Sequence, residues 1–170
     1  DKVELQLLMQ DGGVHRPLGG AHAALIVAPG VGHLAEPQCR RTAAHCAFLN
    51  DILELPDGKI LVVGSHGSGA GQDIAVTRHH FDGTLDTTFA TDGVLTLGIL
   101  NADDSGHRAS LQPDGKILIT GQSYNGQNWD LAIARISYDG VLDATFDGDG
   151  KLGIPDFNGT HDSGYAVLSM

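Results

Sequence analysis

The sequence is poor in aromatic residues, in cysteine and in long apolar runs. Its 170 residues include five Phe, three Tyr, one Trp and two Cys. No apolar stretch approaches the roughly 18 residues that a membrane-spanning helix requires, so we expect no membrane span. No charged segment followed by an apolar one opens the sequence either, so it shows no export signal of its own. The length suffices for one domain with a real core.

Basic residues are also scarce, and the shortage is confined to one part of the chain. Ten Lys and Arg face 21 Asp and Glu, a formal net charge of −11. Residues 1–50 carry four acidic and four basic side chains, whereas residues 51–170 carry 17 acidic and six basic ones. A field of that sign repels nucleic acid and attracts cations. Nucleic acid is therefore not an expected partner.

Glycine is abundant, with 24 residues, and many of these glycines belong to an internal repeat. The segment Pro-Asp-Gly-Lys-Ile-Leu at residues 56–61 recurs 57 positions later at residues 113–118. Between residues 56–95 and 113–152, 20 of the 40 aligned pairs are identical. Chance does not produce such agreement, so residues 51–170 form a tandem repeat.

Each repeat predicts β-structure. Alternating side chains after the second Pro-Asp-Gly indicate strands with two unlike faces, and Pro-Asp-Gly itself favours a hairpin turn. The expected strands lie at residues 58–64, 73–81, 116–121, 130–138, 151–154 and 164–169. Four short strands joined by tight turns describe a propeller blade. The predicted fold class is all-β, with antiparallel four-stranded, β-propeller-like units.

Three parts of the second repeat carry a family resemblance. Residues 112–118 read Gln-Pro-Asp-Gly-Lys-Ile-Leu, residues 130–135 read Asp-x-Ala-x-x-Arg, and residues 139–146 read Asp-Gly-x-Leu-Asp-x-Thr-Phe. This pattern resembles the bacterial repeats called delta-60 repeats, although Leu55 replaces the Gln in the earlier copy. The resemblance implies a module of a large exported bacterial protein, and therefore an extracellular or cell-surface location.

The N-terminal part departs from the pattern. Residues 2–14 indicate the third strand of a partial blade, whereas residues 15–50 abandon the repeat. We therefore expect about three units: a degraded one at residues 1–50, and repeat units at residues 51–112 and 113–170. Strand edges left open at both ends favour a homo-oligomer. In the alternative, residues 15–50 fold across an edge and cover it.

Both cysteines lie in this divergent part. Cys39 and Cys46 form a disulfide or remain two thiols, and the sequence leaves both possibilities open. Residues 42–46 resemble the segment around the catalytic His of chymotrypsin-like proteases, and Asp-Ser-Gly occurs at residues 104–106 and 162–164. Both Asp-Ser-Gly copies occupy the same repeat position and lack the flanking glycines of that family. A serine protease is therefore not the favoured hypothesis.

One loop has a pattern of carboxylates that suits a metal ion. Asp143, Asp147 and Asp149 are interleaved with glycine, and Ca²⁺ prefers oxygen ligands on a chain that can fold around it. We predict Ca²⁺ as a cofactor at these three residues. The alternative is ordinary turn chemistry, and Asp103 with Asp104 is a second, weaker candidate.

A second loop differs between the repeats and suits a ligand. Residues 123–129 contain Tyr124, Asn125 and Trp129, whereas the counterpart at residues 66–72 has no aromatic residue. Where two copies share a scaffold, function concentrates in the loop that differs. We predict that these three residues bind a small molecule or a carbohydrate. In the alternative, Trp129 closes the end of the core.

Two functions are consistent with these observations. The first is an extracellular bacterial repeat module for binding or surface interaction that also binds Ca²⁺. The second is a Ca²⁺-dependent hydrolase of lactones or esters, like some propeller enzymes in which the metal polarises the carbonyl. The second rests on analogy between folds alone.

Overall fold

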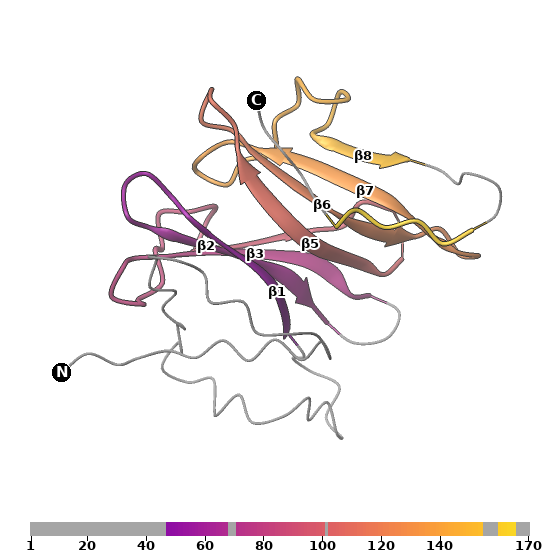
Figure 1. Cartoon of the computed structure of the whole chain (residues 1–170), viewed down its shortest axis with the longest axis horizontal. Coiled ribbons are helices and arrows are strands. Elements are labelled where there is room, and N and C mark those ends of the chain that lie inside the picture. Colours follow the sequence, from indigo (N-terminus) through magenta and orange to yellow (C-terminus); the bar gives the residue numbers. More distant parts are fainter. Residues whose placement is uncertain (1–46, 68–70, 101, 155–159, 166–170) are drawn as a thin grey trace, which may run out of the picture.

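A computed structural model of the chain describes residues 47–67, 71–100, 102–154 and 160–165, which form two antiparallel sheets (Figure 1). The first sheet has the order β1-β2-β3-β4 and the second the order β5-β6-β7-β8. The strands are β1 (Ala47–Glu54), β2 (Ile60–His66), β3 (Asp73–His79), β4 (Val94–Leu97), β5 (Asp104–Leu111), β6 (Ile117–Tyr124), β7 (Trp129–Ile136) and β8 (Lys151–Ile154). The described residues contain no helix, and thus none that could cross a membrane. The prediction of an all-β, propeller-like fold with four-stranded antiparallel units is confirmed.

The sheets are offset by one strand from the sequence repeats. Each sheet begins with the strand that precedes its Pro-Asp-Gly turn, so the first sheet runs from residue 47 to 97 and the second from 104 to 154. Residues 47–50, which the sequence pattern assigned to the divergent N-terminal part, are the start of β1. The partial unit expected in that part otherwise lies outside the described residues, as do Cys39 and Cys46.

The Pro-Asp-Gly turns have the geometry that their sequence predicts. In the first sheet, the Leu55 nitrogen donates to the Lys59 carbonyl at 2.8 Å, and the Gly58 nitrogen donates to the Leu55 carbonyl at 2.9 Å. The second turn repeats both bonds, and its Gly115 has a φ of 83°. Glycine reaches such positive φ values without strain, so the turn fixes the register of β1 with β2 and of β5 with β6.

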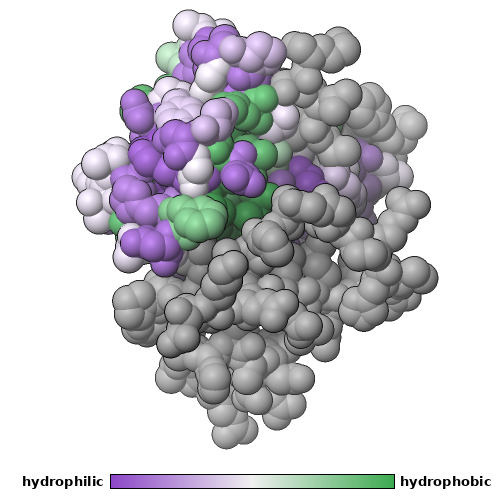
Figure 2. Space-filling model, turned by 60° about the vertical axis from the view of Figure 1, so that its left-hand side comes forward, coloured by the Kyte–Doolittle hydropathy of each residue, from purple (hydrophilic) through white to green (hydrophobic). Residues whose placement is uncertain are grey.

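The two sheets pack face to face around a shared apolar core. β5 lies against β1, β2 and β3, and it links the sheets. The core consists of fully or almost fully buried aliphatic residues and one aromatic residue: Leu55, Leu61, Val63, Ile74, Val76, Phe89, Leu97, Ile117, Ile119, Ala134 and Ile136. On the face shown in Figure 2, a narrow band of apolar residues lies beside a larger hydrophilic area.

A β-bulge in each of β1 and β5 helps to join the sheets. The register shifts between Leu49 and Asp51 in β1, and at the equivalent place in β5. The bulge in β1 turns Asn50 toward β5, where its amide donates to the Gly106 carbonyl at 2.7 Å. The Asp51 carboxylate accepts from the Ala109 nitrogen at 2.8 Å. Bulges re-aim side chains in this way, and here they tie one sheet to the next.

Candidate functional site

The first candidate residue, Asp143, lies in a network of ionic contacts on the second sheet. Its Oδ2 accepts from Nε of Arg135 at 2.7 Å and lies 3.0 Å from Nζ of Lys116. Its Oδ1 accepts from the Thr145 hydroxyl at 2.7 Å. The guanidinium of Arg135 also lies over the Phe146 ring, 5.0 Å from its centroid. We call this cluster, which consists of Lys116, Arg135, Asp143, Thr145 and Phe146, the Arg–Asp lock. All five residues belong to the repeated part of the sequence.

The first sheet contains the same lock. Arg78 donates from Nε to Oδ2 of Asp86 at 2.7 Å, and Lys59 lies 3.0 Å from the same oxygen. Burial acts to raise the pKa of Asp86, but hydrogen bonds from Thr88 and Lys59 outweigh it and hold that pKa well below its usual range. Hydrogen bonds from Thr145 and Lys116 likewise lower the pKa of Asp143. Both carboxylates are therefore held ionised by the fold itself.

The other two carboxylates of the predicted calcium loop lie apart from this lock. Asp147 is exposed and has a φ of 49°. Asp149 accepts a hydrogen bond from the Lys151 nitrogen at 2.9 Å, which shapes the turn into β8. Within the described ranges, no group of three or more His, Cys, Asp or Glu side chains is arranged to hold a metal ion. Calcium binding at Asp143, Asp147 and Asp149 stays a prediction.

The weaker candidate, Asp103 and Asp104, has structural contacts at the junction of the sheets. Asp103 accepts from the nitrogens of Gly71 and Gln72, at 2.7 and 3.1 Å. Asp104 is fully buried, and its Oδ2 accepts from the Ile99 nitrogen at 2.9 Å. Burial raises the pKa of Asp104. These two carboxylates therefore hold the connection between β4 and β5.

The predicted ligand loop is the turn between β6 and β7, and it has a fixed backbone. Oδ1 of Asn125 accepts from the nitrogens of Gln127 and Asn128, at 2.8 and 3.0 Å. Its Nδ2 donates to Oδ1 of Asn128 and, at 2.9 Å, to Oδ2 of the buried Asp130. Asn125 thus closes the turn with both ends of its amide, in the manner of an Asx turn.

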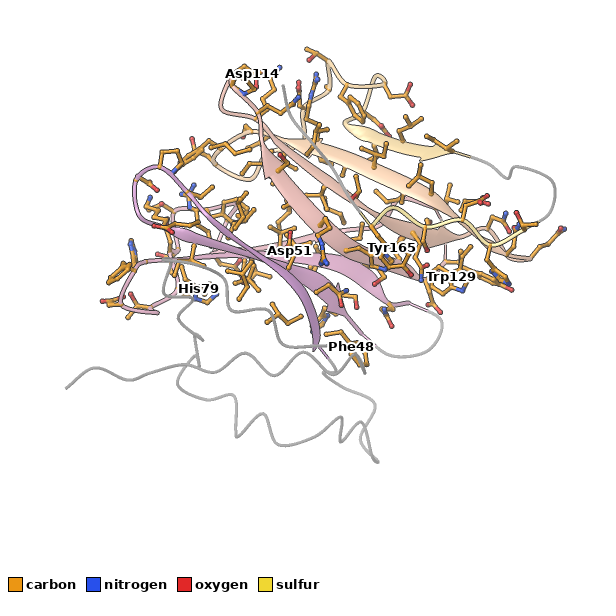
Figure 3. All side chains as sticks on the ribbon, in the orientation of Figure 1. Phe48, Asp51, His79, Asp114, Trp129 and Tyr165 are labelled. Atoms are coloured by element: carbon orange, nitrogen blue, oxygen red, sulfur yellow. The ribbon has the colours of Figure 1, made fainter. Side chains whose placement is uncertain are left out.

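Tyr124 and Trp129 form a cross-strand pair at the base of this turn. Their ring centroids lie 5.5 Å apart with an interplanar angle of 54°. Both residues are half-buried, so each keeps some surface accessible to solvent. Figure 3 shows Trp129 at the end of the second sheet that lies away from the turn carrying Asp114. The structure thus brings Tyr124, Asn125 and Trp129 together.

A third segment, residues 160–165, closes one side of this turn. The Asn128 amide donates to the Thr160 carbonyl at 2.7 Å. The Trp129 nitrogen donates to Nδ1 of His161 at 3.2 Å, and the Asp162 nitrogen donates to the Trp129 carbonyl at 2.7 Å. Sequence reasoning missed Asn128 and His161 as members of this site. The one signal in the sequence was the repeat of Asp-Ser-Gly at residues 104–106 and 162–164, which indicates that the two segments occupy equivalent positions.

The matching turn of the first sheet has different chemistry. Gly67 and Gly71 have φ values of 113° and 125°, and the backbone after them is held by Asp103. Its described residues contain no aromatic side chain. The two sheets therefore share the lock, the Pro-Asp-Gly turns and the register, and they differ at this turn.

Comparison with known proteins supports the repeat. Residues 55–89 and 112–146 each match the model of a family described as a domain of unknown function (DUF5122) beta-propeller. Each match runs from the Pro-Asp-Gly turn to the Phe of the lock. No curated protein and no solved structure gave a significant match. The chain thus carries two copies of a β-propeller-like repeat, while the delta-60 type and a bacterial origin stay predictions.

Proposed function

We propose that this chain is a non-catalytic β-propeller repeat module that binds a small molecule or a carbohydrate at the turn between β6 and β7. One observation carries the proposal. The two sheets keep the same lock and the same hairpins, yet only the second places Tyr124 and Trp129 side by side, with ring centroids 5.5 Å apart. A scaffold that repeats while one turn diverges is the pattern of a binding site on a rigid support.

The chemistry of the turn suits a ligand with apolar faces and hydroxyl groups. Aromatic rings offer large contact areas at low cost in conformational entropy. The ring of Trp129 contacts the ring of Tyr124 on the paired strand. The exposed Gln127 adds an amide group in the same turn, whereas the amide of Asn125 is engaged within the turn and fixes its backbone. Because the Asn125 network fixes the backbone, little order has to be gained on binding.

The setting that we propose for the module is an exported protein at the cell surface. The support is the resemblance of the repeat signature and the net charge of −11. Calcium binding and association of copies belong to the same proposal. We do not adopt the alternative, Ca²⁺-dependent hydrolysis of lactones or esters, because no contact in the described residues favours it.

Trp129 makes the proposal easy to test, because it is the one Trp of the sequence. A panel of mono- and oligosaccharides and small apolar ligands is titrated into the protein while tryptophan fluorescence and heat of binding are recorded. We expect a saturable change in both signals for at least one sugar class. Tyr124→Ala should weaken binding at least tenfold, because it removes half of the aromatic pair.

The matched control is Phe81→Ala, which removes an exposed aromatic residue from a turn of the first sheet. This variant should bind like the parent protein. The proposal is wrong if no sugar or small apolar ligand of the panel binds. It is equally wrong if binding survives both Tyr124→Ala and Trp129→Ala.

A further inference from the structure

The two Arg–Asp locks are identical in sequence but differ in what covers them. The Arg78 side chain is 1% exposed and donates from Nη1 to the Tyr138 carbonyl of the second sheet at 2.6 Å. The Arg135 side chain is 20% exposed. Among the residues that the structure describes, Nη1 of Arg135 has no such acceptor. The second lock therefore lacks the cover that the first one has.

That cover is the turn that follows β7. The Ala90 nitrogen donates to the Asp139 carbonyl at 2.8 Å. A Cβ added at Gly140 would lie 2.8 Å from Cε2 of Phe89, so only glycine lets the turn come so close. Phe89 is fully buried as a result.

The phenol ring of the same turn also reaches the first Pro-Asp-Gly turn. Burial and a hydrogen bond to Asp57 raise the pKa of Tyr138 to about 12. The covering turn thus contributes a carbonyl, a glycine and a phenol.

The residues of the first sheet that contact the covering turn have counterparts in the second sheet. Asp147 has a φ of 49°, and Ala90, its counterpart, has a φ of 52°. Phe146 takes the place of Phe89 but is only partly buried. Asp114 takes the place of Asp57, in the equivalent turn. The backbone that would receive a covering turn is therefore already formed.

Residues 160–165 mark where such a cover would begin. The Asp104 nitrogen at the start of β5 donates to the Gln72 carbonyl at 2.6 Å, and the Asp162 nitrogen makes the equivalent bond to the Trp129 carbonyl at 2.7 Å. A Cβ on Gly106 would lie 2.8 Å from Cγ2 of Ile74. A Cβ on Gly164 would lie 2.6 Å from Leu131, the counterpart of Ile74.

Tyr165, the next residue, stacks on the His107 ring with centroids 4.8 Å apart. Figure 3 shows Tyr165 over the strands of the second sheet. The segment is therefore placed on the second sheet as β5 is placed on the first.

We propose that the face of the second sheet around Arg135 and Phe146 is a docking surface for a further unit of the same repeat. Residues 162–165 begin the first strand of that unit. The turn after its third strand lies on Phe146, accepts a hydrogen bond from Nη1 of Arg135 and directs a phenol to Asp114. This surface differs from the proposed ligand site at the turn between β6 and β7, although residues 160–165 border both.

A second copy of this chain fits the surface less well. Its β1 would have to lie where residues 162–165 already lie. In addition, its turn presents Phe81 where Tyr138 supplies a hydroxyl group. The partner is therefore a unit that carries an aromatic-Asp-Gly turn and shares its first strand with this chain.

The experiment extends the full chain by a copy of residues 113–154 placed after Met170. We expect the extended protein to unfold in one cooperative transition, with a denaturant dependence about half again as steep, because the slope scales with the surface exposed. The Arg135 Nε–H signal in NMR should then exchange at least tenfold more slowly than in the parent chain. Arg78, already covered, should not change.

The control is the same extension with Gly140→Val in the appended copy, which blocks the close approach of the turn. In this control the Arg135 signal should keep its fast exchange. Three results would overturn the proposal: an appended unit that remains unfolded, one that melts in a separate transition, or slow exchange at Arg135 in the unextended monomer.

Discussion

Arg78 reaches across the junction of the two sheets and donates a hydrogen bond from Nη1 to the Tyr138 carbonyl at 2.6 Å. Its Nε meanwhile holds Asp86, and both side chains are 1% exposed. We expect Arg78→Ala to lower the free energy of unfolding by about 3–5 kcal/mol, because it removes one of the two cations, Arg78 and Lys59, that pair with the buried Asp86 carboxylate. Urea denaturation measures the loss.

Arg135→Ala is the matched control, since Arg135 makes the same bond to Asp143 at a more exposed position. It should cost clearly less than Arg78→Ala, because this ion pair is more accessible to solvent, which screens it. Equal losses for the two variants would contradict the view that the second sheet protects the first lock.

Replacing two glycines of the second sheet by alanine should destabilise the fold to different extents. Gly121 faces the bulge of β5, and a Cβ there would overlap with the Ser105 carbonyl, a backbone atom. Gly121→Ala should therefore destabilise the fold by about 3 kcal/mol or more. Gly115 has a φ of 83° but open space around it, so Gly115→Ala should cost only about 1–2 kcal/mol. Thermal unfolding compares the two, and a larger loss at Gly115 would contradict the reasoning.

The strands after each Pro-Asp-Gly turn were predictable, because turn chemistry and alternation agree there. The strands before the turns were not assigned to the sheets that follow them. β5 buries Asp104, Ser105 and His107, which a pattern of apolar alternation does not recognise as a buried strand. These polar groups lie where the sheets meet, so their burial is a tertiary effect that local pattern cannot reveal.

The candidate site was predictable only in part, for the same reason. Tyr124 and Trp129 lie on one short hairpin, so their proximity follows from the sequence. The partners of Asp143 do not, since Arg135 and Lys116 come from other strands. The repeat in the sequence identifies these residues, but it does not reveal the ion pairs that they form between strands.

If the loop after Asp143 binds calcium, we expect the binding to depend on Asp147 and Asp149. The Asp143 oxygens already accept from Arg135 and Thr145. With only two exposed carboxylates left to bind the ion, we expect a weak site, in the range of about 10⁻⁴ to 10⁻³ M. Millimolar Ca²⁺ should then raise the melting temperature, since binding to the folded state stabilises it. Calorimetry with the variant Asp147→Ala/Asp149→Ala is the check, and binding that is absent or unaffected by this variant would remove the assignment.

His107 should make stability fall in mild acid. Burial lowers the pKa of His107 below its ordinary value of 6.5, because it outweighs the hydrogen bond to Gly164, which raises the pKa. The unfolded chain therefore takes up the proton first as the pH drops, so stability is full above about pH 6.5 and decreases below it. His107→Phe should flatten the dependence of the melting temperature between pH 7 and 5. The exposed His80 is the control, and His80→Gln should leave the slope unchanged.

Association of copies is expected to occur through the first sheet, whose turn after β3 is uncovered in the described structure. Phe81 is 76% exposed there, whereas Tyr138, at the equivalent position, packs against the core of the first sheet. Phe48 and Leu49 of the edge strand β1 are also exposed. Exposed apolar side chains next to an open sheet edge favour pairing with another chain.

Phe81→Asp should therefore weaken self-association at least tenfold in sedimentation velocity at micromolar concentrations, because a charge replaces the aromatic contact. Val141→Asp is the matched control: Val141 is 62% exposed and lies directly after the turn of the second sheet that already covers Phe89. It should leave association unchanged. A parent chain that stays monomeric would remove the homo-oligomer from the proposal, and equal effects of the two variants would locate the interface elsewhere.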